Sequence, residues 1–105
     1  MAQIIWTEPA LSDLNDIAEY VALDNITAAT QLVKKVFSST EQIAQFPKSG
    51  RQPPELNESR YLEIIVGPCR IFYRIDQQTI YILYVMRSER ELRKYLLDDR
   101  ANSTP

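Results

Sequence analysis

Five arginines in the second half of the chain are the residues best suited to bind a charged partner or to support chemistry. The set comprises Arg70, Arg74, Arg87, Arg90 and Arg93. A guanidinium group presents several N–H donors in a fixed plane, which suits carboxylate and phosphate oxygens. We therefore take these five as candidate contacts with a target. For Arg70 and Arg74 a structural role, paired with Glu63 across a hairpin, is the open alternative.

The residue types that the chain lacks restrict its chemistry. It contains no histidine, which removes the usual general base, the Ser-His and Cys-His nucleophile pairs and most zinc chemistry. Its two glycines do not form a phosphate-binding loop, and its single cysteine, Cys69, has no internal partner for a disulfide. Any catalysis would rest on Arg, Lys, Glu, Asp or Tyr, and we expect no metal and no cofactor.

Length and composition predict one ordinary globular domain. The chain has 105 residues, of which 45% are hydrophobic and 25% charged. We expect a single domain over residues 1–100 and a disordered tail over 101–105. No apolar run approaches the ~20 residues of a membrane span, and no signal peptide is visible, so we expect a cytoplasmic protein.

Charge is unevenly distributed although the net charge is only −2. Acidic residues dominate before Pro47, and basic residues slightly outnumber acidic ones from Arg60 onward. This predicts a locally positive surface in the second half. The overall charge is not that of a nonspecific nucleic-acid binder, and we expect no sequence-specific DNA binding by this chain alone.

Residues 61–90 alternate between apolar and polar side chains, which is typical of half-buried strands. Gly67-Pro68 and Gln77-Gln78 interrupt the alternation and predict two tight turns, giving three antiparallel strands. Two-residue turns would set the register and place one apolar set on a single face. That face is expected to carry Leu62, Ile64, Val66, Ile71, Tyr73, Ile75, Ile80, Ile82, Tyr84 and Met86.

The opposite face of the predicted sheet mixes aromatic, aliphatic and charged side chains, and we call it the mixed face. Charged groups resist full burial, so a mixed face is better suited to a partner than to a core. The apolar centre of this partner surface would be Phe72, Tyr81, Leu83 and Val85. The remaining members of the mixed face are Tyr61, Glu63, Ile65, Arg70, Arg74 and Arg87.

The first half of the chain predicts a short strand over 3–7 and two amphipathic helices. Thr7 and Pro9 mark the start of a helix ending near Leu23, and Asn25 or Thr27 caps a second that ends near Phe46. The two should form an antiparallel hairpin that covers the apolar sheet face. The acids of the first helix, Asp13, Asp16 and Glu19, are expected to be solvated.

Two connections complete the predicted order. Residues 48–59 read as a loop because they contain Gly50, Pro53, Pro54 and Asn57. Ser88 followed by Glu91 matches a capping box, so a short last helix is expected to begin there.

This order of elements resembles the RelE/ParE toxin superfamily. Residues 6–10 and 17–21 resemble its first strand and helix, 46–51 resemble the exit from its second helix, and 61–74 resemble its central hairpin in the ParE version. The resemblance implies an α+β fold. A short N-terminal strand and an antiparallel helical hairpin would pack on a mainly antiparallel sheet with three C-terminal strands, followed by a short C-terminal helix.

The superfamily contains two activities, and the resemblance favours the ParE type. RelE-like toxins cut messenger RNA on the ribosome, whereas ParE-like toxins inhibit DNA gyrase and are neutralised by a ParD-type antitoxin. The lysine pair of RelE-like toxins would fall near Tyr61 and Glu63, and neither is lysine. Loss of one charge that stabilises a phosphoryl transition state costs ~10²-fold in rate, and an acid there repels phosphate.

The resemblance assigns roles to the residues singled out above. Target binding would fall to the five arginines, and antitoxin binding to Phe72, Tyr81, Leu83 and Val85. Two alternatives remain open. A ribosome-dependent messenger RNA endoribonuclease would use Arg70, Arg87, Arg90 and Tyr95. A degenerate, non-toxic binding module is suggested by Leu62 and Cys69, which depart from the arginine and tyrosine that the family pattern leads one to expect.

Overall fold

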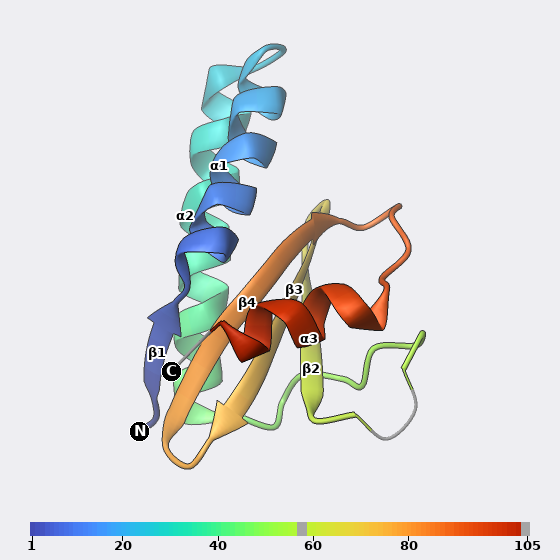
Figure 1. Cartoon of the computed structure of the whole chain (residues 1–105). Coiled ribbons are helices and arrows are strands. Elements are labelled where there is room, and N and C mark those ends of the chain that lie inside the picture. The colour runs from blue at the N-terminus through green and yellow to red at the C-terminus, as the bar shows by residue number, and fades with distance from the viewer. Residues whose placement is uncertain (57–58, 104–105) are drawn as a thin grey trace.

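The computed structural model describes residues 1–56 and 59–103, and this part of the chain forms three helices and one four-stranded sheet (Figure 1). The sheet order is β1-β4-β3-β2, with β1 parallel to β4 and the other pairs antiparallel. The predicted α+β fold is confirmed. The elements are β1 Gln3–Trp6, α1 Glu8–Ala22, α2 Ile26–Gln45, β2 Tyr61–Val66, β3 Cys69–Asp76, β4 Thr79–Arg87 and α3 Lys94–Asn102.

Both helices of the hairpin begin at the residues that the sequence predicts. The Thr7 hydroxyl accepts a hydrogen bond from the Ala10 amide at 3.3 Å, and the Asn25 side-chain oxygen accepts one from the Ala28 amide at 3.0 Å. Each cap satisfies an amide that has no partner within its helix. α2 ends at Gln45, just before Phe46 and Pro47, as expected.

The helical hairpin covers one face of the sheet and forms the larger core, as predicted. Leu14 of α1 and Val36 of α2 pack with Ile71, Tyr73 and Ile82, and all five are at most 3% exposed. The ring of Trp6 on β1 lies 4.9 Å from that of Phe37 on α2. This core holds α1 beside β4, so side chains of the helix and of the strand lie next to each other.

Both predicted turns form with the predicted pairing, Val66 opposite Cys69 and Ile75 opposite Ile80. In the second turn Gln77 adopts a φ of 56°, a conformation that residues other than glycine rarely enter. Because glutamine is unusual at such a position, the sequence signal for this turn is weak. Gly50, in the loop before β2, approaches the sheet so closely that a Cβ would lie 2.5 Å from the Tyr73 hydroxyl. That hydroxyl accepts a hydrogen bond from the Gly50 amide and donates one to the Pro47 carbonyl.

A β-bulge in β4 overturns the predicted assignment of its last residues to faces. Phe72 pairs with Tyr84 while the next residue of β3, Tyr73, pairs with Ile82, so Leu83 is the extra residue. An inserted residue shifts the alternation of every side chain that follows it. The continuous alternation from Ile80 to Met86 therefore does not correspond to one face.

The bulge reverses the expected positions of four residues. Tyr84 and Met86 were expected under the hairpin but pack on the opposite face, where the Tyr84 ring meets Phe72 edge-on. Val85 was expected on the mixed face but is 2% exposed within the hairpin core. Arg87 likewise points toward α1. The bulge thus places the side chain of Val85 in the hairpin core and leaves the hydroxyl of Tyr84 outside that core.

The mixed face is a second core rather than an open surface, because α3 crosses it (Figure 1). Phe72 and Leu83 are fully buried there, as is Leu97 of α3, and Ala101 of the same helix is 5% exposed. The expectation that this face would be available to a partner is wrong for these buried residues. This cover was not predicted because α3 has only two buried apolar side chains, Leu97 and Ala101.

The last helix also begins later and ends later than predicted. Residues 88–93 do not form a helix, and α3 starts at Lys94 with Arg93 as a cap position that makes no side-chain cap bond. The predicted capping box at Ser88 is therefore wrong. α3 continues to Asn102, so the expected disordered tail does not begin at residue 101, and residues 104–105 lie outside the described part of the chain.

We predict that Leu97→Ala lowers the free energy of unfolding by about 2–5 kcal/mol, since it removes a fully buried side chain from the second core. Tyr95→Ala is the matched control on the same helix, because Tyr95 is 67% exposed, and should change stability by less than about 0.5 kcal/mol. Urea denaturation measures both. Equal effects would contradict the packing of α3 on the sheet.

Candidate functional site

Arg70 on β3 lies at the centre of a buried ionic network, which we call the Arg70 cluster and which comprises Arg51, Glu55, Glu63 and Arg70. The Arg70 Nε donates to Glu63 at 2.5 Å, and its two terminal nitrogens donate to the two oxygens of Glu55 at 2.7 Å each. The Arg51 Nε donates to the other oxygen of Glu63 at 3.0 Å. The Glu63 side chain is completely buried and that of Arg70 is 6% exposed. Two carboxylates therefore neutralise this arginine.

The Arg70 cluster also fixes two loops against the sheet. Glu55 accepts a hydrogen bond from the Leu92 amide at 3.0 Å, and Arg70 donates one to the Arg90 carbonyl at 3.0 Å. The bidentate bond from Arg70 lowers the pKa of Glu55 to about 2, and the same bond raises the pKa of Arg70. Pairing with Glu63, the alternative left open for Arg70 and Arg74, is found for Arg70, and Glu55 is an additional partner that was not predicted.

Arg74 is the second arginine of β3, and the fold encloses it as well. It is 8% exposed, and its guanidinium lies 4.3 Å from the centre of the Tyr81 ring. Asp76 lies 3.7 Å from one of its terminal nitrogens. Arg70 and Arg74 therefore do not present their charges on an open surface, although the mixed face was predicted to be exposed.

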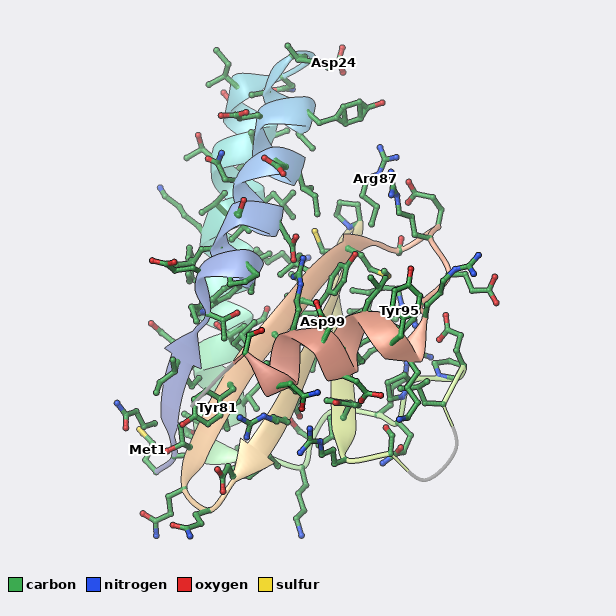
Figure 2. All side chains as sticks on the ribbon, viewed as in Figure 1. Met1, Asp24, Tyr81, Arg87, Tyr95 and Asp99 are labelled. Atoms are coloured by element: carbon green, nitrogen blue, oxygen red, sulfur yellow. The ribbon has the colours of Figure 1, made fainter. Side chains whose placement is uncertain are left out.

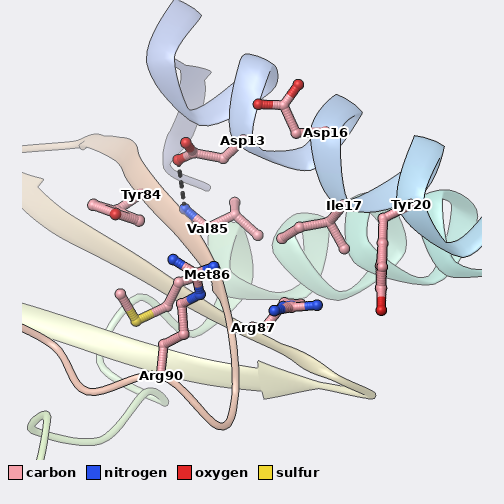
Figure 3. Close-up of a pocket in the computed structure, with 9 residues that line it drawn as sticks. All are labelled: Asp13, Asp16, Ile17, Tyr20, Tyr84, Val85, Met86, Arg87 and Arg90. Atoms are coloured by element: carbon pink, nitrogen blue, oxygen red, sulfur yellow. Dashed lines mark hydrogen bonds between the residues drawn. The ribbon is translucent and has the colours of Figure 1, made fainter.

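A groove of about 410 Å³ between α1 and the end of β4 combines charges of both signs with apolar side chains, and we call it the β4 groove (Figure 3). Arg87 and Arg90 contribute positive charge, while Asp13 and Asp16 of α1 contribute negative charge. Aliphatic and aromatic side chains complete the lining. These further lining residues are Ile17, Tyr20, Tyr84, Val85 and Met86.

The two arginines of the β4 groove differ in how they are held. The Arg87 guanidinium lies 5.0 Å from the centre of the Tyr20 ring (Figure 3). It also pairs with Glu89 at 2.9 Å. Arg90 is exposed, and its backbone carbonyl is the group that Arg70 binds. The Arg70 cluster thus positions the backbone of the segment from which Arg90 projects.

Asp13 and Arg100 form an ion pair that joins α1 to α3 across the edge of β4. Both terminal nitrogens of Arg100 donate to the carboxylate of Asp13, and the pair is partly buried. The Arg100 guanidinium also lies 3.9 Å from the centre of the Tyr84 ring. Asp13 was expected to be solvated, and this expectation is wrong.

The structure separates the residues that the sequence grouped together. Phe72 and Leu83 are buried beneath α3, Val85 lies in the hairpin core, and Tyr81 is partly exposed. The residues named for a ribonuclease do not converge either. Arg87 and Arg90 line the β4 groove, Arg70 is enclosed in its cluster, and Tyr95 lies on the outer surface of α3 (Figure 2). Arg93 is exposed in the segment before α3.

Three residues of the site were not predicted from the sequence. They are Glu55 in the Arg70 cluster, Tyr20 in the β4 groove and Arg100 in the ion pair with Asp13. Asp13 and Arg100 are 87 residues apart in the chain, and no local pattern indicates their pairing. The alternation of the strand could not reveal the bulge that brings Val85 beside Asp13. Within residues 1–56 and 59–103, no acidic cluster suited to a metal ion occurs, and no helix has the length and apolar character to cross a membrane.

Comparison with known proteins identifies the family. The model of the family described as "ParE toxin of type II toxin-antitoxin system, parDE" matches residues 4–92, which is most of the chain. This chain belongs to the ParE toxin family. The toxin is thus a component of a type II toxin–antitoxin system, as the resemblance implied.

Two curated relatives carry the word toxin in their names. Toxin Y4kP of Sinorhizobium fredii is 33% identical over 89 residues, covering 85% of this toxin and 91% of the relative. Toxin RelE2 of Caulobacter vibrioides is 26% identical over 91 residues, covering 86% and 99%. The second relative therefore carries a RelE name, although the family model that matches this chain is that of ParE toxins.

Two solved structures share the fold. A chain of the chromosomal ParDE system of P. aeruginosa matches with a TM-score of 0.69 at 25% identity, covering 85% of this toxin and 98% of that chain. A chain of the RelBE2 toxin–antitoxin complex of Mycobacterium tuberculosis matches with a TM-score of 0.55 at 20% identity, covering 82% and 96%. The second likeness concerns the fold alone.

We predict that Arg70→Ala lowers the free energy of unfolding by about 3–5 kcal/mol, because it leaves the buried Glu63 carboxylate without its main partner. Arg93→Ala, at an exposed position, should change stability by less than about 0.5 kcal/mol. Thermal and urea denaturation measure both. Wild-type stability for Arg70→Ala would contradict the structural role of the cluster.

The depressed pKa of Glu55 predicts a specific dependence of stability on pH. Its carboxylate stabilises the fold above its ordinary pKa of 4.5, and this contribution disappears as the pH falls from 4.5 toward about 2. The stability difference between wild type and Glu55→Gln should therefore be largest near pH 6 and shrink below pH 4.5. Glu91→Gln, at an exposed position, is the control, and a difference for Glu55→Gln that does not change with pH would contradict the assignment.

Proposed function

We propose that this ParE-family toxin inhibits DNA gyrase by binding to it, and that a ParD-type antitoxin neutralises it. Its action is docking rather than phosphoryl chemistry. Gyrase acts on chromosomal DNA, so the proposal places the toxin in the cytoplasm.

The observation that carries this proposal is the state of Arg70. A ribonuclease needs cations that face the phosphate whose charge grows in the transition state. Here Glu55 and Glu63 already occupy the donors of Arg70, and its side chain is 6% exposed. The hydroxyl of Tyr61 donates to Asp98 at 2.6 Å. Neither this tyrosine nor the buried Glu63 offers a positive charge to a substrate.

The segment 88–93 and the end of β4 are the regions that we assign to target contact. Arg90 and Arg93 are exposed there, and Arg87 lies at the adjoining β4 groove. Exposed guanidinium groups suit an acidic protein surface. Arg70 contributes indirectly, because it binds the backbone carbonyl of Arg90. Arg74 packs against Tyr81 and lies near Asp76, so we assign it to the packing of the sheet rather than to target contact.

We predict that purified toxin inhibits gyrase-catalysed supercoiling, and that Arg90→Glu/Arg93→Glu weakens inhibition at least about tenfold, since two attractive charges become repulsive. Lys34→Glu/Lys35→Glu is the matched control, because it makes the same charge change on the exposed surface of α2. The control should inhibit like wild type. Toxin concentration is varied at fixed gyrase and salt.

Each contrary outcome has a distinct meaning. No inhibition at micromolar toxin, together with codon-linked cuts in messenger RNA during expression, would replace the proposal with a RelE-like ribonuclease. Normal growth on induction without antitoxin would instead indicate a non-toxic binding module. Equal loss of inhibition in both double variants would refute the assignment of residues 88–93 as the contact.

A further inference from the structure

The loop before β2 reaches the segment 88–93 through one side chain, that of Glu55. The Oε2 atom of Glu55 accepts hydrogen bonds from the Leu92 amide at 3.0 Å and from one terminal nitrogen of Arg70 at 2.7 Å. Its Oε1 atom accepts from the other terminal nitrogen of Arg70 at 2.7 Å. Both oxygens of this carboxylate therefore bind groups of the toxin itself. From the sequence this loop was expected to be only a connector.

A proline turn sets the position of Glu55. The Leu56 amide donates to the Pro53 carbonyl at 3.0 Å, so these four residues form a turn with Pro54 at its second position. Proline fixes φ near −65° (about the angle that this position of a turn needs), so the turn is restricted before the chain folds. The Leu56 side chain is buried in the second core. The carboxylate of Glu55 is therefore delivered from a rigid support.

Two consecutive peptide units of the segment 88–93 are held by this network. Arg70 donates to the Arg90 carbonyl, and Glu55 accepts from the Leu92 amide, each at 3.0 Å. These two groups belong to the peptide bonds on either side of Glu91, so the backbone of Glu91 is fixed at both ends. The Leu92 side chain, 3% exposed in the second core, adds a third attachment. The segment is thus ordered in the free toxin.

Glu55 is not needed to neutralise the buried charge of Arg70. Glu63 is completely buried and already pairs with Arg70 at 2.5 Å. The Arg51 guanidinium, which also binds Glu63, is 52% exposed and therefore solvated. What Glu55 adds is the connection to Leu92. Its negative charge near the exposed arginines of the segment would by itself weaken their attraction to an acidic surface. The benefit of Glu55 for such a contact therefore lies in geometry rather than in charge.

We propose that Glu55 is a positioning residue for target contact, because it holds the backbone of residues 88–93 in the shape that presents Arg90 and Arg93 to an acidic surface of the target. This inference rests on the proposed function, which supplies the target. A segment that is ordered before binding loses less conformational entropy when it binds. Release of a few residues from this shape raises the toxin concentration needed for inhibition about tenfold.

The first test measures gyrase inhibition by Glu55→Ala and Glu55→Gln. Alanine should raise the half-inhibitory toxin concentration about tenfold, whereas glutamine retains an acceptor oxygen for the Leu92 amide and should stay within about threefold. The sign is informative, because loss of an acid would strengthen attraction to an acidic surface if charge alone acted. Glu41→Ala makes the same charge change on the exposed surface of α2 and should inhibit like wild type. Inhibition by Glu55→Ala that equals or exceeds wild type would overturn the inference.

The second test separates positioning from a general loss of stability. Val36→Ala removes buried volume from the hairpin core and destabilises the fold far from the segment, so it should inhibit within about twofold of wild type while it remains folded. In an Arg90→Ala/Arg93→Ala background, Glu55→Ala should cause less than about a twofold further loss, since the side chains that it positions are gone. A tenfold further loss in that background, or a tenfold loss for Val36→Ala, would refute the positioning role.

The third measurement needs no gyrase and follows amide hydrogen exchange in the toxin alone. The Leu92 amide should exchange at least about tenfold faster in Glu55→Ala than in wild type, because its acceptor is removed. The Thr7 amide, which donates to the Ile82 carbonyl at 3.2 Å, is the internal control and should change by less than about twofold. Equal Leu92 exchange in the two proteins would show that Glu55 does not order the segment.

These measurements distinguish failure of this inference from failure of the proposed function. If wild-type toxin inhibits gyrase and Glu55→Ala inhibits equally well, only the positioning role is wrong. If wild-type toxin does not inhibit gyrase, the proposed function fails and this inference fails with it.

Discussion

The pairing of Glu63 with Arg70 is the interaction on which the rest of this structure depends. A fully buried carboxylate is tolerated only with a partner, and removal of one member of such a pair costs about 3–5 kcal/mol. Because Arg70 has donors to spare, it also binds Glu55 and the Arg90 carbonyl. These bonds hold the loop before β2 and the segment before α3 against the sheet. α3 can then close over the face on which Arg70 lies.

The bulge at Leu83 is the second constraint, and it acts on both faces and on one edge of the sheet. It places Val85 in the core under the hairpin and Tyr84 beneath the opposite side, where Arg100 packs on its ring. It also turns the Val85 amide toward α1, where Asp13 receives it. The same Asp13 carboxylate also accepts hydrogen bonds from Arg100. The Asp13–Arg100 pair thus connects α1 and α3, which cover different faces of the sheet, across the edge of β4.

Local signals predicted most of this fold, and long-range pairings account for what they missed. Caps, alternation and turn spacing located α1, α2 and the three C-terminal strands, because each is encoded within a few residues. The bulge was not predictable, since Ile80, Ile82, Tyr84 and Met86 form an unbroken alternating series. Glu63 was correctly linked to Arg70 because the hairpin register determines that contact. Glu55 and Arg100 were missed because they reach their partners through loops and helices whose positions the sequence does not define.

Arg70 is held in a structural network, and we propose that the toxin acts by docking on its target. Induction of the toxin in cells lacking the antitoxin tests this most directly, if covalent gyrase–DNA complexes and the 5′ ends of messenger RNA are measured in the same culture. We predict that gyrase–DNA complexes accumulate within minutes while messenger RNA remains intact. Codon-linked messenger RNA cuts without an increase in gyrase–DNA complexes would contradict the account.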